Sequence, residues 1–347
     1  MEIRDFLVDK DEIIMEAMRK LDRNGYGIIF ICENEMLKGS LSDGDFRRYM
    51  LKGGDINQNV GEIANSNPHF LTLGDGVDSV QYIRNNRIKA IPIVDKQGEI
   101  VRIDFENGNS VFKKLENPIP VVIMAGGKGN RLLPYTNILP KPLIPIGEQT
   151  IAEHIIKQFE NVGCDEFYMI VNYMKNFIKT YFQESYEEKK VQFVDENEYM
   201  GTGGGLGLLK GMFHEPFFMT NCDILVEENY DLIMKFHKEK GNLATMVCAE
   251  KEIEIPYGTV QVDESSYLTE LREKPKYTFL TNTGLYLLEP EFLDRIPENT
   301  FINITDLFQA CIERGEQVGV YKIKEASWMD MGQIEELNKM KQRKVKM

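Results

Sequence analysis

A glycine-rich segment over residues 125–134 (AGGKGNRLLP) has the clearest potential for chemistry in this sequence. It follows the apolar run 121–125, which has the composition of a strand buried on both faces. Glycines let backbone N–H groups approach a phosphate because no Cβ intervenes, and Arg131 adds a planar, bidentate cation. The segment lacks the GK[ST] of a Walker A loop and the third glycine of GxGxxG. It therefore predicts a phosphate-binding loop of another type.

A second segment, residues 139–146 (LPKPLIPI), places Lys141 between two prolines. Proline fixes its own φ and disfavours helical backbone in the residue before it, so we expect Lys141 in a stiff, extended chain. A rigid lysine close to a glycine loop is suited to binding a triphosphate.

Together the two segments resemble the signature of the sugar-phosphate nucleotidyltransferases, also called nucleotide-sugar pyrophosphorylases. The matching positions are Ala125, Gly126, Gly127, Gly129, Arg131, Pro134 and the Pro-Lys-Pro-Leu of residues 140–143. Asn130 stands where this family usually has threonine. The resemblance implies a Rossmann-like α/β domain with a mixed, mostly parallel sheet. It also implies a nucleotide site at the matching glycines, Arg131 and Lys141.

Further motifs match the same family in order. Residues 198–205 (EYMGTGGG) resemble the family loop against nucleobase and sugar, which implies nucleotide-binding roles for Gly201, Thr202 and Gly203. The alternative is that these glycines only form the entry to a helix over 206–210. The motif Arg272-Glu273-Lys274-Pro275 resembles the family segment that binds sugar hydroxyls through its glutamate and sugar phosphate through its lysine, although an exposed charge run is the simpler interpretation. The segment Asn282-Thr283-Gly284-Leu285-Tyr286 matches a family strand whose asparagine faces the sugar, and a weaker match at Tyr257-Gly258 implies that Gly258 belongs to a substrate loop.

Two aspartates match the metal site of the family. Asp223 follows the apolar run 217–220, and ligands bind at the carboxyl ends of parallel strands in such sheets. Asp330 lies in Trp328-Met329-Asp330-Met331-Gly332. Pairing these residues around Mg²⁺ rests on the resemblance, because they are far apart in sequence. Cys222 is interpreted as space-filling.

The implied reaction is an in-line attack by a sugar-phosphate oxygen on the α-phosphorus of an NTP, releasing pyrophosphate. Both reactants are anions, so catalysis needs positive charge and alignment. Arg131, Lys141, Asp223 and Lys274 are the expected catalytic residues. A general base is not required, since the attacking phosphate oxygen is already ionised at neutral pH.

The elements around these motifs predict two domains. Residues 121–347 alternate strands and amphipathic helices, as in a doubly wound α/β fold. Residues 1–112 contain a helix–strand–turn–strand unit twice and resemble a pair of cystathionine-β-synthase-type (CBS) modules. Residues 113–120 are the expected linker. Ser42 and Asp45 match the family positions that hold the ribose of an adenosine nucleotide, and the alternative is that they only cap a helix.

Composition excludes several classes of protein. The chain has 347 residues and a formal charge of −14, which argues against nucleic acid and anionic membranes as partners. The five scattered cysteines are typical of reduced thiols, so we expect a cytoplasmic protein. No stretch is long and apolar enough for a transmembrane helix, and the four histidines lack metal-ligand spacing. A homo-oligomer is expected, with the CBS pair regulating the enzyme or assisting assembly.

The substrate is the least determined point. The form of residues 201–204 and the CBS fusion resemble bacterial guanylyltransferases for surface-glycan precursors, so GTP and glucosamine 1-phosphate are the first expectation. UTP, dTTP or CTP remain open. A metal-dependent glycosyltransferase usually needs an Asp-x-Asp motif, which Asn221-Cys222-Asp223 lacks, and a non-catalytic nucleotide sensor would not need the aspartates.

Overall fold

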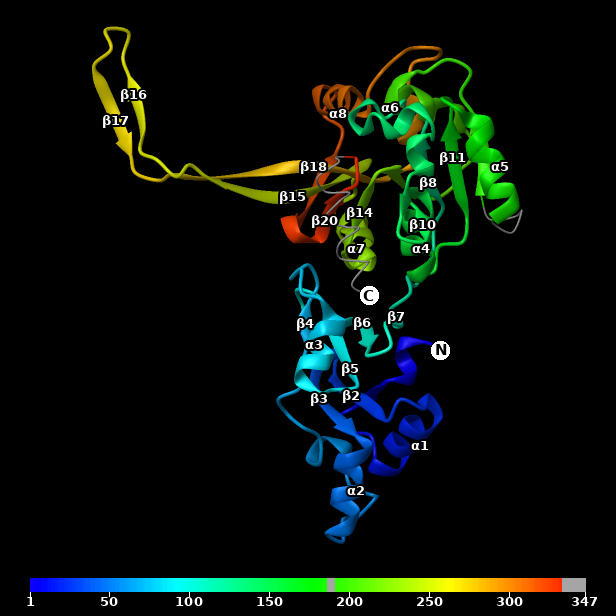
Figure 1. Cartoon of the computed structure of the whole chain (residues 1–347), viewed down its shortest axis with the longest axis vertical. Coiled ribbons are helices and arrows are strands. Elements are labelled where there is room, and N and C mark those ends of the chain that lie inside the picture. Colours follow the sequence, from blue (N-terminus) through cyan, green and yellow to red (C-terminus); the bar gives the residue numbers. More distant parts are fainter. Residues whose placement is uncertain (186–190, 333–347) are drawn as a thin grey trace.

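The computed structural model describes residues 1–185 and 191–332. The chain forms an N-terminal part, drawn blue to cyan, and a larger α/β part beside it, from which a long pair of strands projects (Figure 1). The last strand of the N-terminal part ends at Phe112, and the first strand of the α/β sheet begins at Val121. The end of the expected catalytic domain, residues 333–347, lies outside the described residues.

A seven-stranded sheet forms the centre of the α/β part, in the order β12-β11-β8-β13-β18-β15-β19. Its strands are β8 (Val121–Ala125), β11 (Phe167–Val171), β12 (Val191–Asp195), β13 (Phe217–Asn221), β15 (Ala244–Glu254), β18 (Lys276–Leu288) and β19 (Val318–Lys324). Four neighbouring strands, β12 to β13, are parallel, β18 is antiparallel to both of its neighbours, and β15 pairs with β19 in parallel. The prediction of a mixed, largely parallel sheet is confirmed.

Both faces of this sheet are buried. Along β8, Val121, Ile123 and Ala125 pack into one apolar cluster, whereas Val122 and Met124 pack into another. This alternation is the period of a strand, and it explains why the run contains no polar residue. The covering helices are α4 (Ile151–Asn161), α5 (Lys175–Ser185), α7 (Tyr230–Lys240) and α8 (Ile304–Glu313).

The N-terminal part contains the expected repeat. Its strands are β1 (Leu7–Asp9), β2 (Ile28–Glu33), β3 (Met36–Ser42), β4 (Leu71–Thr72), β5 (Ala90–Val94), β6 (Ile100–Phe105) and β7 (Ser110–Phe112), and its helices are α1 (Ile14–Asn24), α2 (Asp43–Leu51) and α3 (Ser79–Asn86). In each half, a short first strand pairs in parallel with a second strand, which pairs antiparallel with a third. The two halves share an aromatic core, in which the ring centroids of Phe6 and Phe105 are 5.2 Å apart. The repeat is thus present, and its assignment as a CBS pair stays a prediction.

The segment expected to be a linker belongs partly to the α/β core. Leu115 and Ile119 are buried in the same cluster as β8, and the Leu115 N–H donates to the Val162 carbonyl at 2.8 Å. These two apolar side chains pack into the core, although the Gly, Asn and Pro residues around them favour a linker.

Two further sequence expectations concern the cysteines and membrane spans. All five cysteines are free and buried, as predicted. Within the described residues, no helix has the length and apolar character needed to cross a membrane.

A buried histidine makes the stability of the α/β part depend on pH. His237 on α7 lies 2.7 Å from Thr245 Oγ1 through Nδ1 and 3.1 Å from Glu289 Oε1 through Nε2. Burial lowers the pKa of His237 below 6.5, although Glu289 opposes this shift. The free energy of unfolding therefore includes a contribution from neutral His237 above about pH 6.5. That contribution is lost as the pH falls through the lower pKa that His237 has in the folded protein. In urea unfolding at pH 7.5 and pH 5.5, we expect wild type to lose more stability on acidification than His237→Gln, and an equal loss would contradict this.

Candidate active site

The glycine loop leaves the carboxyl end of β8 and turns back under Lys141. Gly129 has φ +67°, and a Cβ there would lie 3.0 Å from Lys141 Cβ and 2.9 Å from Thr136 Cγ2. A side chain at Gly129 would therefore meet both strain and steric conflict. Arg131 follows in a 3-10 turn over Asn130–Leu132. The loop thus brings one exposed arginine and one buried lysine together.

Lys141 is positioned differently from the expectation. It opens a 3-10 turn over Lys141–Leu143, so the prediction of extended backbone at this residue is wrong. Pro142 occupies the first turn, where its fixed φ is compatible with helical geometry and its missing N–H costs nothing. The consequence for the side chain is as predicted, because Lys141 is only 10% exposed and cannot swing freely.

Asp223 and Asp330 lie side by side. β14 (Ile224–Val226) begins immediately after Asp223, and β20 (Trp328–Asp330) pairs antiparallel with it, with Ile224 opposite Asp330. The Met331 N–H donates to the Asp223 carbonyl at 2.7 Å. A pairing of strands about a hundred residues apart in sequence therefore produces the proximity that spacing could not indicate.

Two cations converge on these carboxylates. Lys141 Nζ makes an ion pair and hydrogen bond with Asp223 Oδ2. Arg131 reaches both aspartates, with Nη2 at 3.4 Å from Asp223 Oδ2 and Nη1 at 3.8 Å from Asp330 Oδ2. The four charges form one mixed cluster, in which the Asp223 side chain is 6% exposed and that of Arg131 is 65% exposed. Its cationic rim faces solvent, where an anion can arrive.

Gly332 lies against both aspartates. A Cβ on this residue would lie 2.2 Å from Asp223 Oδ2 and 2.9 Å from Asp330 Oδ1, so any larger residue would displace the two carboxylates. Mg²⁺ in phosphoryl-transfer sites is commonly held by one or two carboxylates together with substrate phosphates. The residues present therefore fit that ion. In residues 1–185 and 191–332, no group of three or more His, Cys, Asp or Glu side chains could hold a metal by itself.

The second glycine-rich segment has a packing role in the structure. It forms a short helix, α6 (Gly201–Gly204), followed by a 3-10 helix over Gly205–Leu209, whereas a regular helix was expected over 206–210. The N–H groups of Gly203 and Gly204 donate to the Ile302 carbonyl at 3.0 and 3.1 Å. Thr202 Oγ1 accepts from the Ile304 N–H at 3.1 Å. Close approach of residues 300–303 thus accounts for these glycines, and their nucleotide contact stays a prediction.

Sequence reasoning missed Glu196, which links the two glycine segments. It follows β12, is 1% exposed, and accepts a hydrogen bond from the Met200 N–H at 2.7 Å. A Cβ at Gly126 would lie 2.7 Å from Glu196 Oε2, so this carboxyl also touches the first loop. Burial raises the pKa of Glu196. Its place at the carboxyl end of a parallel strand is the signal that could have identified it.

The residues expected to bind the sugar phosphate are divided between two places. Asn282 lies in β18 within the sheet, donating to Tyr286 Oη at 2.7 Å and accepting from the Gly284 N–H at 3.0 Å. Gly258, Glu273 and Lys274 lie instead on the projecting strands, where all three are exposed (Figure 1). The chain therefore does not bring these three residues to Asp223.

Two other candidate residues have structural environments that limit their reactivity. Burial raises the pKa of the Cys222 thiol to about 12, consistent with a space-filling role. Ser42 caps α2 in a reciprocal pair with Asp45, whose carboxylate accepts from the Ser42 N–H at 2.9 Å and from its Oγ at 2.6 Å. The capping alternative is thus realised, and an adenosine-nucleotide role stays a prediction.

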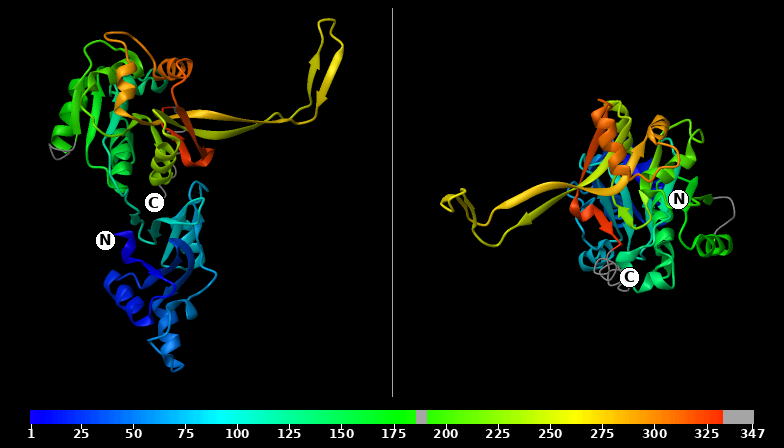
Figure 2. Two further views of the ribbon diagram at one scale, coloured as in Figure 1. Left: turned by 180° about the vertical axis from the view of Figure 1, so that it is seen from behind. Right: turned by 90° about the horizontal axis from the view of Figure 1, so that it is seen from above.

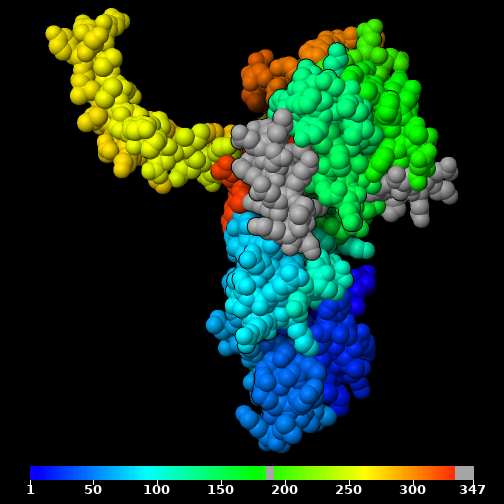
Figure 3. All heavy atoms as spheres, in the orientation of Figure 1, coloured from blue at the N-terminus to red at the C-terminus, as the bar shows by residue number. Residues whose placement is uncertain are grey.

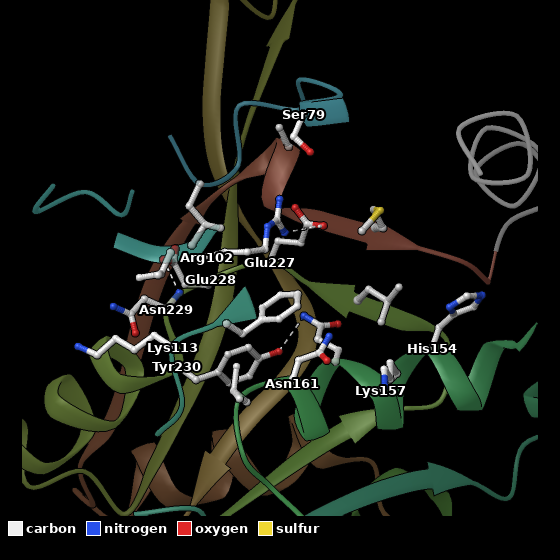
Figure 4. A pocket seen from close by; sticks show the side chains of 18 of the residues that line it. Ser79, Arg102, Lys113, His154, Lys157, Asn161, Glu227, Glu228, Asn229 and Tyr230 are labelled. Atoms are coloured by element: carbon white, nitrogen blue, oxygen red, sulfur yellow. Dashed lines mark hydrogen bonds and ion pairs between the residues drawn. The ribbon is translucent and has the colours of Figure 1, made fainter. Parts of the chain in front are cut away.

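A cavity of about 400 Å³ separates the N-terminal part from the α/β part (Figure 4). Ser79, Arg102 and Lys113 line it from one side, and Lys157 and Tyr230 from the other. Its wall also includes the paired residues Leu225 and Met329 of β14 and β20. Residues of the N-terminal part therefore line the same cavity as β14 and β20, the strands next to the two aspartates.

Comparisons with known proteins agree with this geometry. A UTP–glucose-1-phosphate uridylyltransferase of Synechocystis is 28% identical over 234 residues, covering 61% of this chain and 60% of that protein. A mannose-1-phosphate guanyltransferase of Schizosaccharomyces pombe is 33% identical over 225 residues, covering 61% and 60%. The chain thus spans about 60% of the length of these relatives.

Solved structures support the fold. HddC from Yersinia pseudotuberculosis matches with a TM-score of 0.52 and 22% identity, covering 65% of this chain and 99% of that one. A UDP-glucose pyrophosphorylase complexed with UDP-glucose matches with a TM-score of 0.50 and 18% identity, covering 66% and 99%. The sequence pattern described as "Nucleotidyl transferase" matches residues 120–346. Since that match covers more than half of the chain, and includes the glycine loop, Lys141 and both aspartates, the chain belongs to the nucleotidyl transferase family.

Proposed function

We propose that this protein transfers a nucleoside monophosphate from an NTP to a sugar 1-phosphate, giving an NDP-sugar and pyrophosphate. The observation that carries this proposal is the convergence of Lys141, Arg131, Asp223 and Asp330 beside a glycine loop. This arrangement supplies fixed positive charge next to a pair of carboxylates, as reaction between two anions requires.

The residues divide the work of an in-line displacement. An oxygen of the sugar phosphate forms a bond to the α-phosphorus, the bond from that phosphorus to the bridging oxygen breaks, and pyrophosphate leaves with both electrons. Lys141 and Arg131 hold the triphosphate, Ala125, Gly126, Gly127 and Gly129 supply its backbone cradle, and Lys274 binds the incoming phosphate. Asp223 and Asp330 are the proposed Mg²⁺ ligands, and this ion when bound neutralises phosphate charge. Glu273, Asn282 and Gly258 orient the sugar, while Gly201, Thr202 and Gly203 lie against the nucleoside.

We infer GTP and glucosamine 1-phosphate as the first substrate pair to test, for a cytoplasmic step in glycan biosynthesis. The relatives named as guanylyl- and uridylyltransferases keep both GTP and UTP open. Purified full-length protein should be incubated with each of four NTPs against glucosamine, mannose, glucose and heptose 1-phosphates. We expect pyrophosphate only where both substrates are present, with the NDP-sugar identified by mass. Sugar transfer from an NDP-sugar without pyrophosphate would favour a glycosyltransferase instead.

We also propose that residues 1–112 regulate the enzyme or assist its assembly, with Ser42 and Asp45 as the adenosine-nucleotide site. Support comes from hydrogen bonds that join residues 1–112 to the α/β part. Asn229 donates to Asp95 at 2.8 Å and Lys324 donates to Asp75 at 2.9 Å across the boundary.

Deleting residues 1–112 tests this role. The cut must stop before Leu115, because Leu115 and Ile119 are part of the catalytic core. We expect the truncated enzyme to keep turnover while losing its response to AMP or ATP or changing its oligomeric state, measured by pyrophosphate release and light scattering. A truncated enzyme that matches wild type in both respects would contradict the proposal.

A further inference from the structure

The projecting strands form an arm, defined here as residues 251–279. β15 pairs with β19 only as far as Glu250, and β13 pairs with β18 only over Leu285–Leu288. Beyond these points the described chain continues as a two-stranded ribbon ending in the hairpin of β16 (Thr259–Val262) and β17 (Leu268–Arg272). The arm extends well clear of the body in every view (Figures 2 and 3).

Apolar pairs alternate with polar pairs both in the hairpin and in the stalk of the arm. At the hairpin, Val260 pairs with Leu271 and Val262 with Leu268, whereas polar residues such as Gln261 and Glu270 occupy the other face. In the stalk, Ile253 lies opposite Tyr277, next to Phe279, and Glu252 opposite Thr278 on the other face. Such alternation is typical of a ribbon that packs one face against protein. Yet Val260 is 60% exposed and Leu271 64% exposed, and an isolated hairpin is marginally stable.

The arm also carries the residues that the body lacks. Gly258 and Glu273 face each other at its bend, where a Cβ on Gly258 would lie 3.0 Å from Glu273 Oε2. Lys274 at the same bend has φ +43°, in the left-handed region that non-glycine residues adopt uncommonly. Along β18, Lys276 is six residues from Asn282, which is about 20 Å in an extended strand. The arm of one chain therefore points its phosphate-binding residues away from its own Asp223.

We propose that the arm is exchanged between two copies of this chain, so that Glu273 and Lys274 of each copy complete the sugar-phosphate site of the other. This inference rests on the proposed function, since it concerns the same site. A second copy of this chain would both complete the site of the first copy and cover the apolar residues of its arm. Its body offers a site with Asp223, Asp330 and Lys141 but without Lys274, and its own arm has the same uncovered apolar face. Reciprocal exchange satisfies both chains in a closed twofold dimer.

Active-site complementation tests the exchange. Two inactive variants, Asp223→Asn and Lys274→Ala, are co-expressed with different tags, and the heterodimer is purified through both tags in turn. In an exchanged dimer, the intact body of the Lys274→Ala chain meets the intact arm of the Asp223→Asn chain. One of the two sites is then complete, and we expect about half of the wild-type specific activity. A site built within one chain predicts only the activity of the parental variants.

Every outcome bears on the proposal. Heterodimers as inactive as their parents, or a Lys274→Ala homodimer with wild-type turnover, would overturn it. Wild type that releases no pyrophosphate with any substrate pair would refute the proposed function, and the arm is then judged by assembly alone.

Assembly is measured by sedimentation of the full chain. Leu271→Glu places a charge on the apolar face and should weaken the dimer by at least about tenfold, because it buries an unpaired carboxylate at the contact. Gln261→Glu, on the opposite face of the same hairpin, is the matched control and should leave the dimer intact. A wild-type protein that sediments as a monomer would overturn the exchange. A Leu271→Glu variant that is as dimeric as the Gln261→Glu control would also overturn it, as would the finding that the arm binds only a different protein.

Discussion

Replacing Asp223 by asparagine is expected to reduce pyrophosphate release about 100- to 1000-fold while the fold survives. The substitution removes the charge at the centre of the cluster formed with Lys141, Arg131 and Asp330. The asparagine oxygen still accepts a hydrogen bond from Lys141, so the loss of stability should stay near that of one charged hydrogen bond, about 1.5–3 kcal/mol. Steady-state turnover and thermal unfolding of the same preparation separate the two effects.

Asp294→Asn is the matched control for this substitution. Asp294 is an exposed aspartate of the same domain, far from the cluster in the chain, and its neutralisation should leave turnover unchanged. Undiminished pyrophosphate release by Asp223→Asn would refute the assignment of the site. A reduced rate explained entirely by unfolded protein would mean that Asp223 acts only as a partner for Lys141.

Replacing Lys141 by alanine is expected to lower turnover by a similar factor, about 100-fold or more, because it removes the fixed cation behind the glycine loop. The side chain is 10% exposed and its stem packs against Gly129, so alanine also creates a gap. Asp223 retains Arg131 as a partner at 3.4 Å. Single-turnover rates and the dissociation constant of the NTP, measured in parallel, distinguish lost binding from a slower chemical step.

Lys141→Met separates the charge from the packing, since methionine refills the space of the stem without its ammonium group. If the charge is what matters, the methionine and alanine variants should be equally slow, while the methionine variant unfolds at a higher temperature. Lys240→Ala, at the exposed end of α7, is the control for loss of a lysine. A methionine variant with wild-type turnover would show that Lys141 serves the fold alone.

Several strands of the central sheet could be predicted because they carry their own local signal. β8 and β11 are uninterrupted apolar runs, and α4 begins with a capping box between Thr150 and Glu153. The arm could not be predicted in this way. Its strand β15 runs to Glu254, but from Glu250 onward the sequence is Glu-Lys-Glu-Ile-Glu and no longer resembles a buried strand. A strand that buries only one face, and buries it against a second molecule, has a weaker apolar pattern than a strand buried on both faces.

The site shows the same division between local and long-range information. The glycine loop and Lys141 are close in sequence, so their chemistry could be predicted from spacing and composition. The meeting of Asp223 with Asp330 depends on the pairing of β14 with β20, which no local pattern indicates. Glu196 is a single acidic residue after a strand and has no motif of its own. Gly201, Gly203 and Gly204 show the reverse case, since tight packing against residues 300–303 requires glycine there independently of any ligand.

If the α-phosphorus of an NTP is the atom attacked, each phosphate of the nucleotide has a defined product. Wild-type protein is incubated with glucosamine 1-phosphate and GTP labelled at either the α- or the γ-phosphate, and products are separated by chromatography. We expect the α-label to appear in the NDP-sugar and the γ-label in pyrophosphate. Transfer of the γ-label to the sugar phosphate, or its release as orthophosphate, would refute attack at the α-phosphorus, because both place the chemistry at the other end of the triphosphate.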